Sequence, residues 1–236
     1  MASLGVAAGA SGPQRPLEVR LWVTDAASAY PDVLPRAGAY LRTALHAAGF
    51  EVDVSYGERP QSFAASDDRY VRRVGWPERV LEGVAGLGSV HPARDVNLLL
   101  TDGSVFGATA GYGMRRIAAV AGARYLADMA PADRTPAVVP DTVPAAVVQL
   151  LLHECGHALG LHHADGSVNV TGHDAVVSPM LGGYAWADAA VRRRAIGGDT
   201  NACGAAIPTL TTQRRWLSLR YSGCATAALQ RHHDDR

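Results

Sequence analysis

A short segment between positions 153 and 163 combines residue types and a spacing that suit metal-dependent chemistry. It reads HECGHALGLHH, an H-E-x-x-H-x-x-G-x-x-H pattern whose fixed positions are His153, Glu154, His157, Gly160 and His163. Residues four apart lie on one face of a helix, so the first two histidines can bind the same ion. A third histidine leaves one coordination position open, which is typical of catalytic zinc sites.

Glu154 and Gly160 fit the same interpretation. Glu154 lies about 100° around the helix from His153, so it can act as general base on a metal-bound water without binding the metal. Gly160 predicts the end of the helix, because glycine readily adopts the left-handed conformation, and His163 can then return as third ligand. We expect one catalytic zinc ion, and the sequence leaves a structural calcium ion open. The alternative is a buried helix whose histidines are only hydrogen-bonded.

Together with Ser178-Pro179-Met180 downstream, the histidine pattern resembles the metzincin clan of zinc endopeptidases, in which a methionine-containing turn lies beneath the metal. The reprolysin-like and matrixin-like families are the nearest branches. The resemblance implies that Glu154 is catalytic and that Gly160 and Met180 are structural supports. Ala164 follows the third histidine in place of the usual Asp, Glu, Ser or Pro, so the branch stays open.

The resemblance also implies a fold of the α+β or α/β class. We expect a metzincin-like (zincin) fold: a twisted, mostly parallel sheet with an antiparallel edge strand, a zinc-binding helix and a small irregular C-terminal lobe. A single catalytic domain would cover 17–222, with an upper lobe at 17–160 and a lower lobe at 161–222. A flexible segment at 1–16 and a tail at 223–236 would flank it.

A glycine-rich run ahead of the histidine motif resembles the edge strand beside the active-site cleft of the reprolysin-like enzymes. Its residues are Gly107, Ala108, Thr109, Ala110 and Gly111. Small side chains let another backbone approach, so a peptide substrate could add there as an extra strand. The alternative is an ordinary glycine-rich hairpin, and the sequence does not decide between the two.

Hydrophobic periodicity predicts the elements that would position these residues. Strands are predicted at 17–24, 50–56, 96–101, 117–120 and 123–126. Helices are predicted at 35–48, at 77–86 and from the threonines at 209–212 through Tyr221. Asp141 or Thr142 would cap the histidine-bearing helix, with Pro144 in its first turn. Loops are expected at 57–74 and 164–177.

The cysteines point to an extracellular protein. Cys203 and Cys224 flank the last predicted helix and could form a disulfide, whereas Cys155 is expected to be a free buried thiol. Such a pair favours an oxidising compartment, so we expect secretion, although residues 1–12 lack the positively charged start of a signal peptide.

Two residues near the motif keep open roles. Tyr184 lies four residues beyond Met180, whereas the metal-facing tyrosine of astacins and serralysins lies two beyond their methionine. A carried-over role for Tyr184 is therefore uncertain. His162 could support the ligands, but an exposed loop histidine is the simpler interpretation.

Composition narrows the class of function. The chain has 236 residues and a formal net charge of zero, which argues against a nucleic-acid partner or an anionic membrane surface. No run of apolar residues is long enough to span a bilayer. We expect a monomeric, zinc-dependent endopeptidase acting on polypeptides. The alternatives are an inactive or non-proteolytic zinc- and peptide-binding module on the same fold, and an intracellular processing peptidase.

Overall fold

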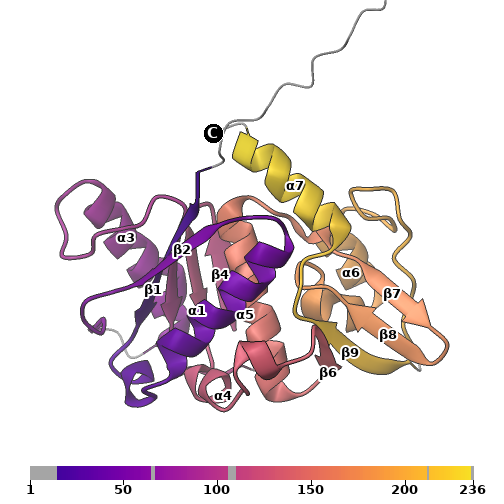
Figure 1. Ribbon diagram of the computed structural model, residues 1–236, viewed down its shortest axis with the longest axis horizontal. Helices are drawn as coiled ribbons and strands as arrows, with labels where there is room; N and C mark the ends of the chain where they lie inside the picture. Colours follow the sequence, from indigo (N-terminus) through magenta and orange to yellow (C-terminus); the bar gives the residue numbers. More distant parts are fainter. Residues whose placement is uncertain (1–14, 65–66, 106–109, 212, 235–236) are drawn as a thin grey trace, which may run out of the picture.

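A mostly parallel sheet forms the centre of the computed structural model, which describes residues 15–64, 67–105, 110–211 and 213–234. Within these residues the sheet has five strands in the order β2-β1-β3-β5-β4 (Figure 1). The first four run parallel, and β4 pairs antiparallel with β5 at the edge. The strands are β2 (Val52–Tyr56), β1 (Leu17–Val23), β3 (Val96–Leu100), β5 (Ile117–Val120) and β4 (Gly111–Met114).

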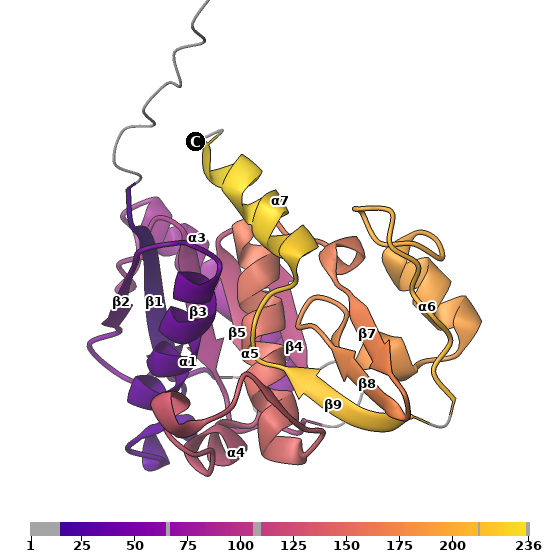
Figure 2. The same cartoon turned by 45° about the vertical axis from the view of Figure 1, so that its right-hand side comes forward.

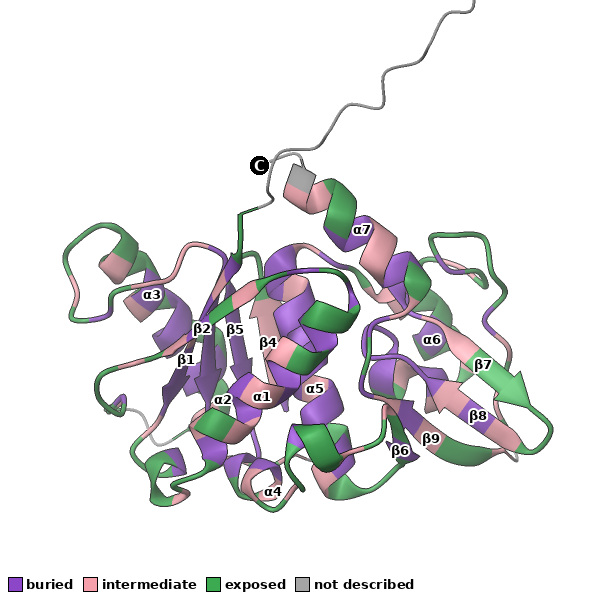
Figure 3. Cartoon of the chain, viewed as in Figure 1, coloured by how far each residue is buried: buried purple, intermediate pink, exposed green. Residues whose placement is uncertain are grey.

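Helices cover both faces of this sheet, which explains why β3 and β5 are buried along their whole length. One face packs against α1 (Val33–Ala47) and α5 (Val143–Leu159) in the main core. The other packs against a π-helical turn, η2 (Val71–Gly75), and α3 (Trp76–Val84). Figure 3 shows the buried strands between these helices. The mixed α/β class expected from the sequence is confirmed.

The lower lobe contains a second sheet, so the prediction of an irregular lobe is wrong. In the described part of the chain its strand order is β6-β9-β8-β7. β7 and β8 form an antiparallel hairpin that turns at Gly172 (φ +60°), in a segment predicted to be a loop. β6 precedes α5 in sequence, so this sheet also includes residues from the predicted upper lobe. The strands are β6 (Val138–Pro140), β9 (Arg214–Ser218), β8 (Asp174–Val177) and β7 (Val168–Thr171).

The last helix begins later than the sequence predicts. Trp216 and Leu217 belong to β9, which pairs with β8 on one side and β6 on the other, so strand pairing overrides the helical spacing. The helix α7 (Gly223–Asp234) occupies the segment expected to be a tail. It packs on the main core, and Figure 2 shows it above the two sheets. Its buried core residues are Ala225, Ala228 and Leu229.

Two further segments differ from their predictions. Residues 123–126, expected as a strand, lie in α4 (Ala123–Ala127), because Gly122 at φ +89° turns the chain out of β5. Residues 57–74, expected as a loop, include α2 (Asp68–Tyr70) and most of η2. The remaining elements are η1 (Ala27–Ala29), η3 (Ala132–Arg134), η4 (His163–Asp165), η5 (Gly182–Trp186) and α6 (Ala189–Ile196). Across the described ranges, every helix is too short or too polar to cross a membrane.

A disulfide joins Cys203 of the lower lobe to Cys224 at the start of α7, the pairing that the sequence suggested. Cys155 is free and buried. The loop that carries Cys203 is also held by Asn201, whose Oδ1 accepts hydrogen bonds from Cys203 N and Ala205 N. The lower lobe is thus covalently attached to a helix that packs on the main core.

We expect thiol counting under denaturing, non-reducing conditions to find one reactive thiol per chain, from Cys155, and three after reduction. Replacing Cys203 and Cys224 by serine should lower the free energy of unfolding in urea by about 3 kcal/mol, the value for a loop of this length. Three reactive thiols without reductant would contradict the disulfide.

Candidate metal centre

The helix that carries the histidine motif begins and ends at the residues that the sequence indicates. Thr142 is the N-cap of α5, and its Oγ1 accepts a hydrogen bond from Ala145 N at 3.4 Å. Pro144 lies in the first turn. Gly160 ends the helix at φ +100°, a conformation that favours glycine. The chain therefore reverses at once and brings His163 back beside the helix.

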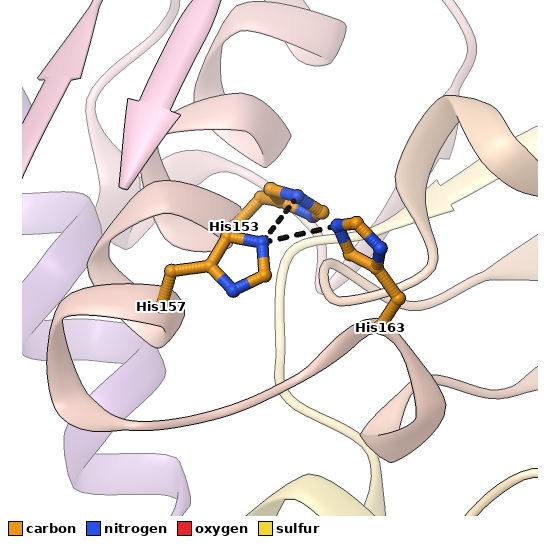
Figure 4. A group of neighbouring side chains, drawn as sticks. All are labelled: His153, His157 and His163. Atoms are coloured by element: carbon orange, nitrogen blue, oxygen red, sulfur yellow. Dashed lines mark hydrogen bonds between the residues drawn. The ribbon is translucent and has the colours of Figure 1, made fainter. Parts of the chain in front are cut away.

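Three imidazole rings converge at the C-terminal end of α5 (Figure 4). His157 Nε2 lies 3.0 Å from His153 Nε2 and 3.1 Å from His163 Nε2. Four-coordinate zinc with Zn–N bonds of about 2.0–2.1 Å separates its ligand nitrogens by about 3.3 Å. The histidines predicted from the sequence are thus close to the spacing that such an ion requires.

The hydrogen bonds of the three Nδ1 atoms determine which nitrogen of each ring carries the proton. A carbonyl oxygen can only accept a hydrogen bond, so each Nδ1 must donate and each Nε2 keeps a free lone pair. Burial also lowers the pKa of His153 to about 3, and lowers the pKa values of His157 and His163, so the rings are neutral at pH 7. The three bonds are His153 Nδ1 to Pro179 O (2.7 Å), His157 Nδ1 to Leu161 O (2.8 Å) and His163 Nδ1 to Ala195 O (3.2 Å).

The three Nε2 lone pairs face one another, and a cation between them would remove their mutual repulsion. With every ring proton engaged by a carbonyl, the Nε2 contacts drawn as dashed lines in Figure 4 have no hydrogen to share and would repel. A neutral imidazole with a free Nε2 and a hydrogen-bonded Nδ1 is the form that binds zinc. The donor set therefore fits a zinc ion.

Met180 packs directly against the helix turn between His153 and His157. Its side chain is fully buried, and a Cβ at Gly156 would overlap its sulfur and lie 3.2 Å from its Cε. Only glycine leaves room for this contact. Gly156 stands at a variable position of the motif, so the sequence pattern gives no signal for it.

Glu154 is buried beside β4, on the same helix as two of the histidines. A Cβ at Gly113 would lie 2.7 Å from Glu154 Oε2 and 2.7 Å from His157 Cβ, and one at Gly111 would overlap Oε1. The two glycines thus make room for the carboxylate. Burial raises the pKa of Glu154 to about 8, and the charges of Arg73 and Arg72 oppose this rise. A carboxyl group in this environment can take up and release a proton near neutral pH.

The histidines and Glu154 line a cleft of about 590 Å³. One wall is the edge strand β4, and the other belongs to the lower lobe. Part of the lining is apolar. Its apolar residues include Ala146, Leu150, Trp186, Val191 and Leu217. The arrangement can hold an extended molecule across the metal position.

The structure shows where the two residues near the motif with open roles lie. The Tyr184 ring lies 4.4 Å from that of His163, measured between centroids, so this tyrosine belongs to the site. His162 is exposed, and its backbone N–H donates to Asp165 Oδ2 at 2.7 Å, as expected of a loop histidine. Residues 107–109 of the predicted edge run lie outside the described residues. Ala110 and Gly111 line the cleft, and Gly111 begins β4.

Purified protein should contain one zinc ion per chain, measured by elemental analysis. His163→Ala should lower the zinc content sharply, because only two converging nitrogens remain. The neighbouring His162→Ala removes an exposed imidazole and should leave the content unchanged. Full zinc in His163→Ala would place the third ligand elsewhere.

Gly156→Ala should destabilise the protein by about 1–3 kcal/mol, because its methyl group overlaps the Met180 sulfur. The sign of this change in stability is informative, because replacing Gly by Ala inside a helix otherwise stabilises a protein by up to about 1 kcal/mol. Gly198→Ala is the control, because a Cβ there meets nothing within 4 Å, and should change stability by less than about 0.5 kcal/mol. Thermal or urea unfolding measures both, and a stabilised Gly156→Ala would refute the contact.

Comparison with known proteins adds no relative to these observations. No protein-family model matches the sequence, and the search of curated proteins finds no match.

Proposed function

We propose that the protein is a zinc-dependent endopeptidase of metzincin-like fold, in which Glu154 is the general base. The observation that carries this proposal is the convergence of three neutral histidine nitrogens in one cleft with a buried carboxylate that is not part of the cluster. Metal binding alone would not require that carboxylate, whereas hydrolysis by a metal-bound water does.

The architecture around the site supports a metzincin-like fold. The sheet is parallel except for its antiparallel edge strand, the histidine motif ends α5, and Met180 packs under that helix turn. These are the features that the sequence resemblance implies. The second sheet of the lower lobe is an addition to the expected pattern.

The edge strand supports binding of an extended peptide. Ala121 N donates to Ala110 O at 2.9 Å, and the register pairs Tyr112 with Ala119. Alternate residues of an antiparallel strand bond to the same neighbour, so the backbone groups of Gly111 and Gly113 point away from β5. No strand among the described residues lies on that side. A substrate can therefore pair there as an additional strand.

The reaction follows from the position of Glu154. A zinc ion held by His153, His157 and His163 would lower the pKa of a bound water and polarise the scissile carbonyl. Glu154 accepts the proton that the attacking water loses and delivers it to the leaving amine. Gly111 and Gly113 confine this carboxylate between β4 and α5. The apolar part of the cleft suits an apolar substrate side chain next to the cleaved bond.

The two alternative functions differ from this proposal in one feature each. An inactive binding module would keep the zinc and the edge strand but would not need Glu154 as a proton acceptor. An intracellular processing peptidase would work in a reducing compartment, whereas the disulfide between Cys203 and Cys224 favours an oxidising one. We therefore favour a secreted enzyme that acts on polypeptides, and the monomeric state stays a prediction from the sequence.

Glu154→Gln should keep the zinc and the fold, because the amide has nearly the same shape and Glu154 is not a ligand. It should lower the rate of peptide hydrolysis by about 10²- to 10⁴-fold, the usual contribution of general acid–base catalysis. His157→Ala should lose both metal and activity. Hydrolysis and zinc content are measured on the same preparations, and wild-type rates in Glu154→Gln would refute the mechanism.

A further inference from the structure

Two adjacent arginines on η2 have different surroundings. Arg72 is buried, forms an ion pair with Asp68, and donates to Thr101 Oγ1 at 3.0 Å. Arg73 is exposed and lines the cleft, with its guanidinium carbon 6.0 Å from the centre of the Tyr112 ring. In the ranges that the structure describes, Arg73 has no ion pair with a carboxylate. Its charge acts on Glu154 at a distance, but no carboxylate among the described residues pairs with its guanidinium directly, so that group can form hydrogen bonds to a ligand.

Arg73 lies on the face of β4 opposite the catalytic carboxylate. Gly111 and Gly113 direct their hydrogens toward Glu154, so Tyr112 between them must point to the other face. Ala119, the cross-strand partner of Tyr112, confirms this, because it packs in the cluster that η2 and α3 form on that face. Tyr112 and Arg73 thus lie together on this face of β4, at the unpaired edge of the sheet.

A peptide that pairs with Gly111 and Gly113 would place one residue directly opposite Tyr112. Cross-strand neighbours have Cβ atoms about 4.5–5.5 Å apart on the same face, so this residue would direct its side chain toward Arg73. The acidic side chains of the described cleft lining are Asp141 and Glu154. Glu154 faces the other side of β4, and Asp141 lies just before the N-cap of α5.

We infer that Arg73 and Tyr112 form a subsite for an aspartate or glutamate side chain of the substrate, at the residue that pairs opposite Tyr112. Arginine binds carboxylates through two parallel hydrogen bonds, and the Tyr112 ring lies at the outer limit of cation–π range from the Arg73 guanidinium. Because Tyr112 lies between the two glycines that contact Glu154, the acidic residue falls close to the cleaved bond. This inference rests on the proposed peptidase function.

The test uses matched peptides. Cleavage sites in a denatured protein mixture are mapped first, and one well-cleaved sequence is then made with Asp or Asn at each position around the bond. At one position the wild type should favour Asp over Asn by about tenfold or more in kcat/KM, as expected for a charge-assisted hydrogen bond. Arg73→Gln should abolish this preference, and Arg73→Glu should reverse it, so that the Asn peptide is cleaved faster than the Asp peptide. Any general effect of Arg73 on Glu154 changes the cleavage of both peptides equally, so it does not alter the ratio of their kcat/KM values.

Arg69→Gln is the matched control, because it removes the same charge from an exposed arginine on the neighbouring α2 that does not line the cleft. It should keep the Asp preference. A second readout avoids catalysis: zinc-loaded Glu154→Gln should bind the fluorescent Asp peptide about tenfold more tightly than the Asn peptide, by fluorescence anisotropy. Adding Arg73→Gln should remove that difference.

The outcomes separate the subsite from the peptidase function. Equal cleavage and binding of the Asp and Asn peptides at every position would overturn the subsite and leave the endopeptidase intact. A preference that survives Arg73→Gln would also overturn it. If wild-type protein with full zinc neither cleaves nor binds any peptide, the proposed function fails and the subsite fails with it.

Discussion

Three neutral imidazoles can point their lone pairs at one place only if other groups hold their protons, and here three main-chain carbonyls do so. The carbonyls belong to Pro179 before Met180, to Leu161 after the helix, and to Ala195 in α6. None of them lies within α5, so the helix alone cannot orient its own two histidine rings. The site exists only when the turn, the lower lobe and α5 are folded together.

The same helix is confined on two sides by glycines. Gly111 and Gly113 bring the edge strand onto Glu154, and Gly156 brings Met180 onto the turn between His153 and His157. A side chain at any of these positions would separate layers that must touch. Close packing, which leaves no spare volume in a protein interior, therefore positions the carboxylate as firmly as hydrogen bonds position the histidines.

What the sequence predicts well is what depends on neighbouring residues. The cap at Thr142, the stop at Gly160 and the spacing of His153 and His157 are local, and the structure agrees with them. The sequence predicts a helix where β9 lies, because β9 depends on pairing with β6 and β8, which no local pattern reports. The same holds for Arg73, which reaches the cleft from η2, and for Tyr184, which meets His163 only after the lower lobe folds.

The hydrogen bond between His163 and the Ala195 carbonyl also bears on how well the protein resists proteolysis. If His163 is the third ligand of the proposed zinc site, its bond to α6 would link metal affinity thermodynamically to the ordering of α6, and each would strengthen the other. A bound ion would then stabilise the lower lobe, and this lobe would unfold locally more often without the ion. Open segments are the ones that proteases cut. The supply of metal would thus govern the lifetime of this protein in a protease-rich setting, as well as its activity.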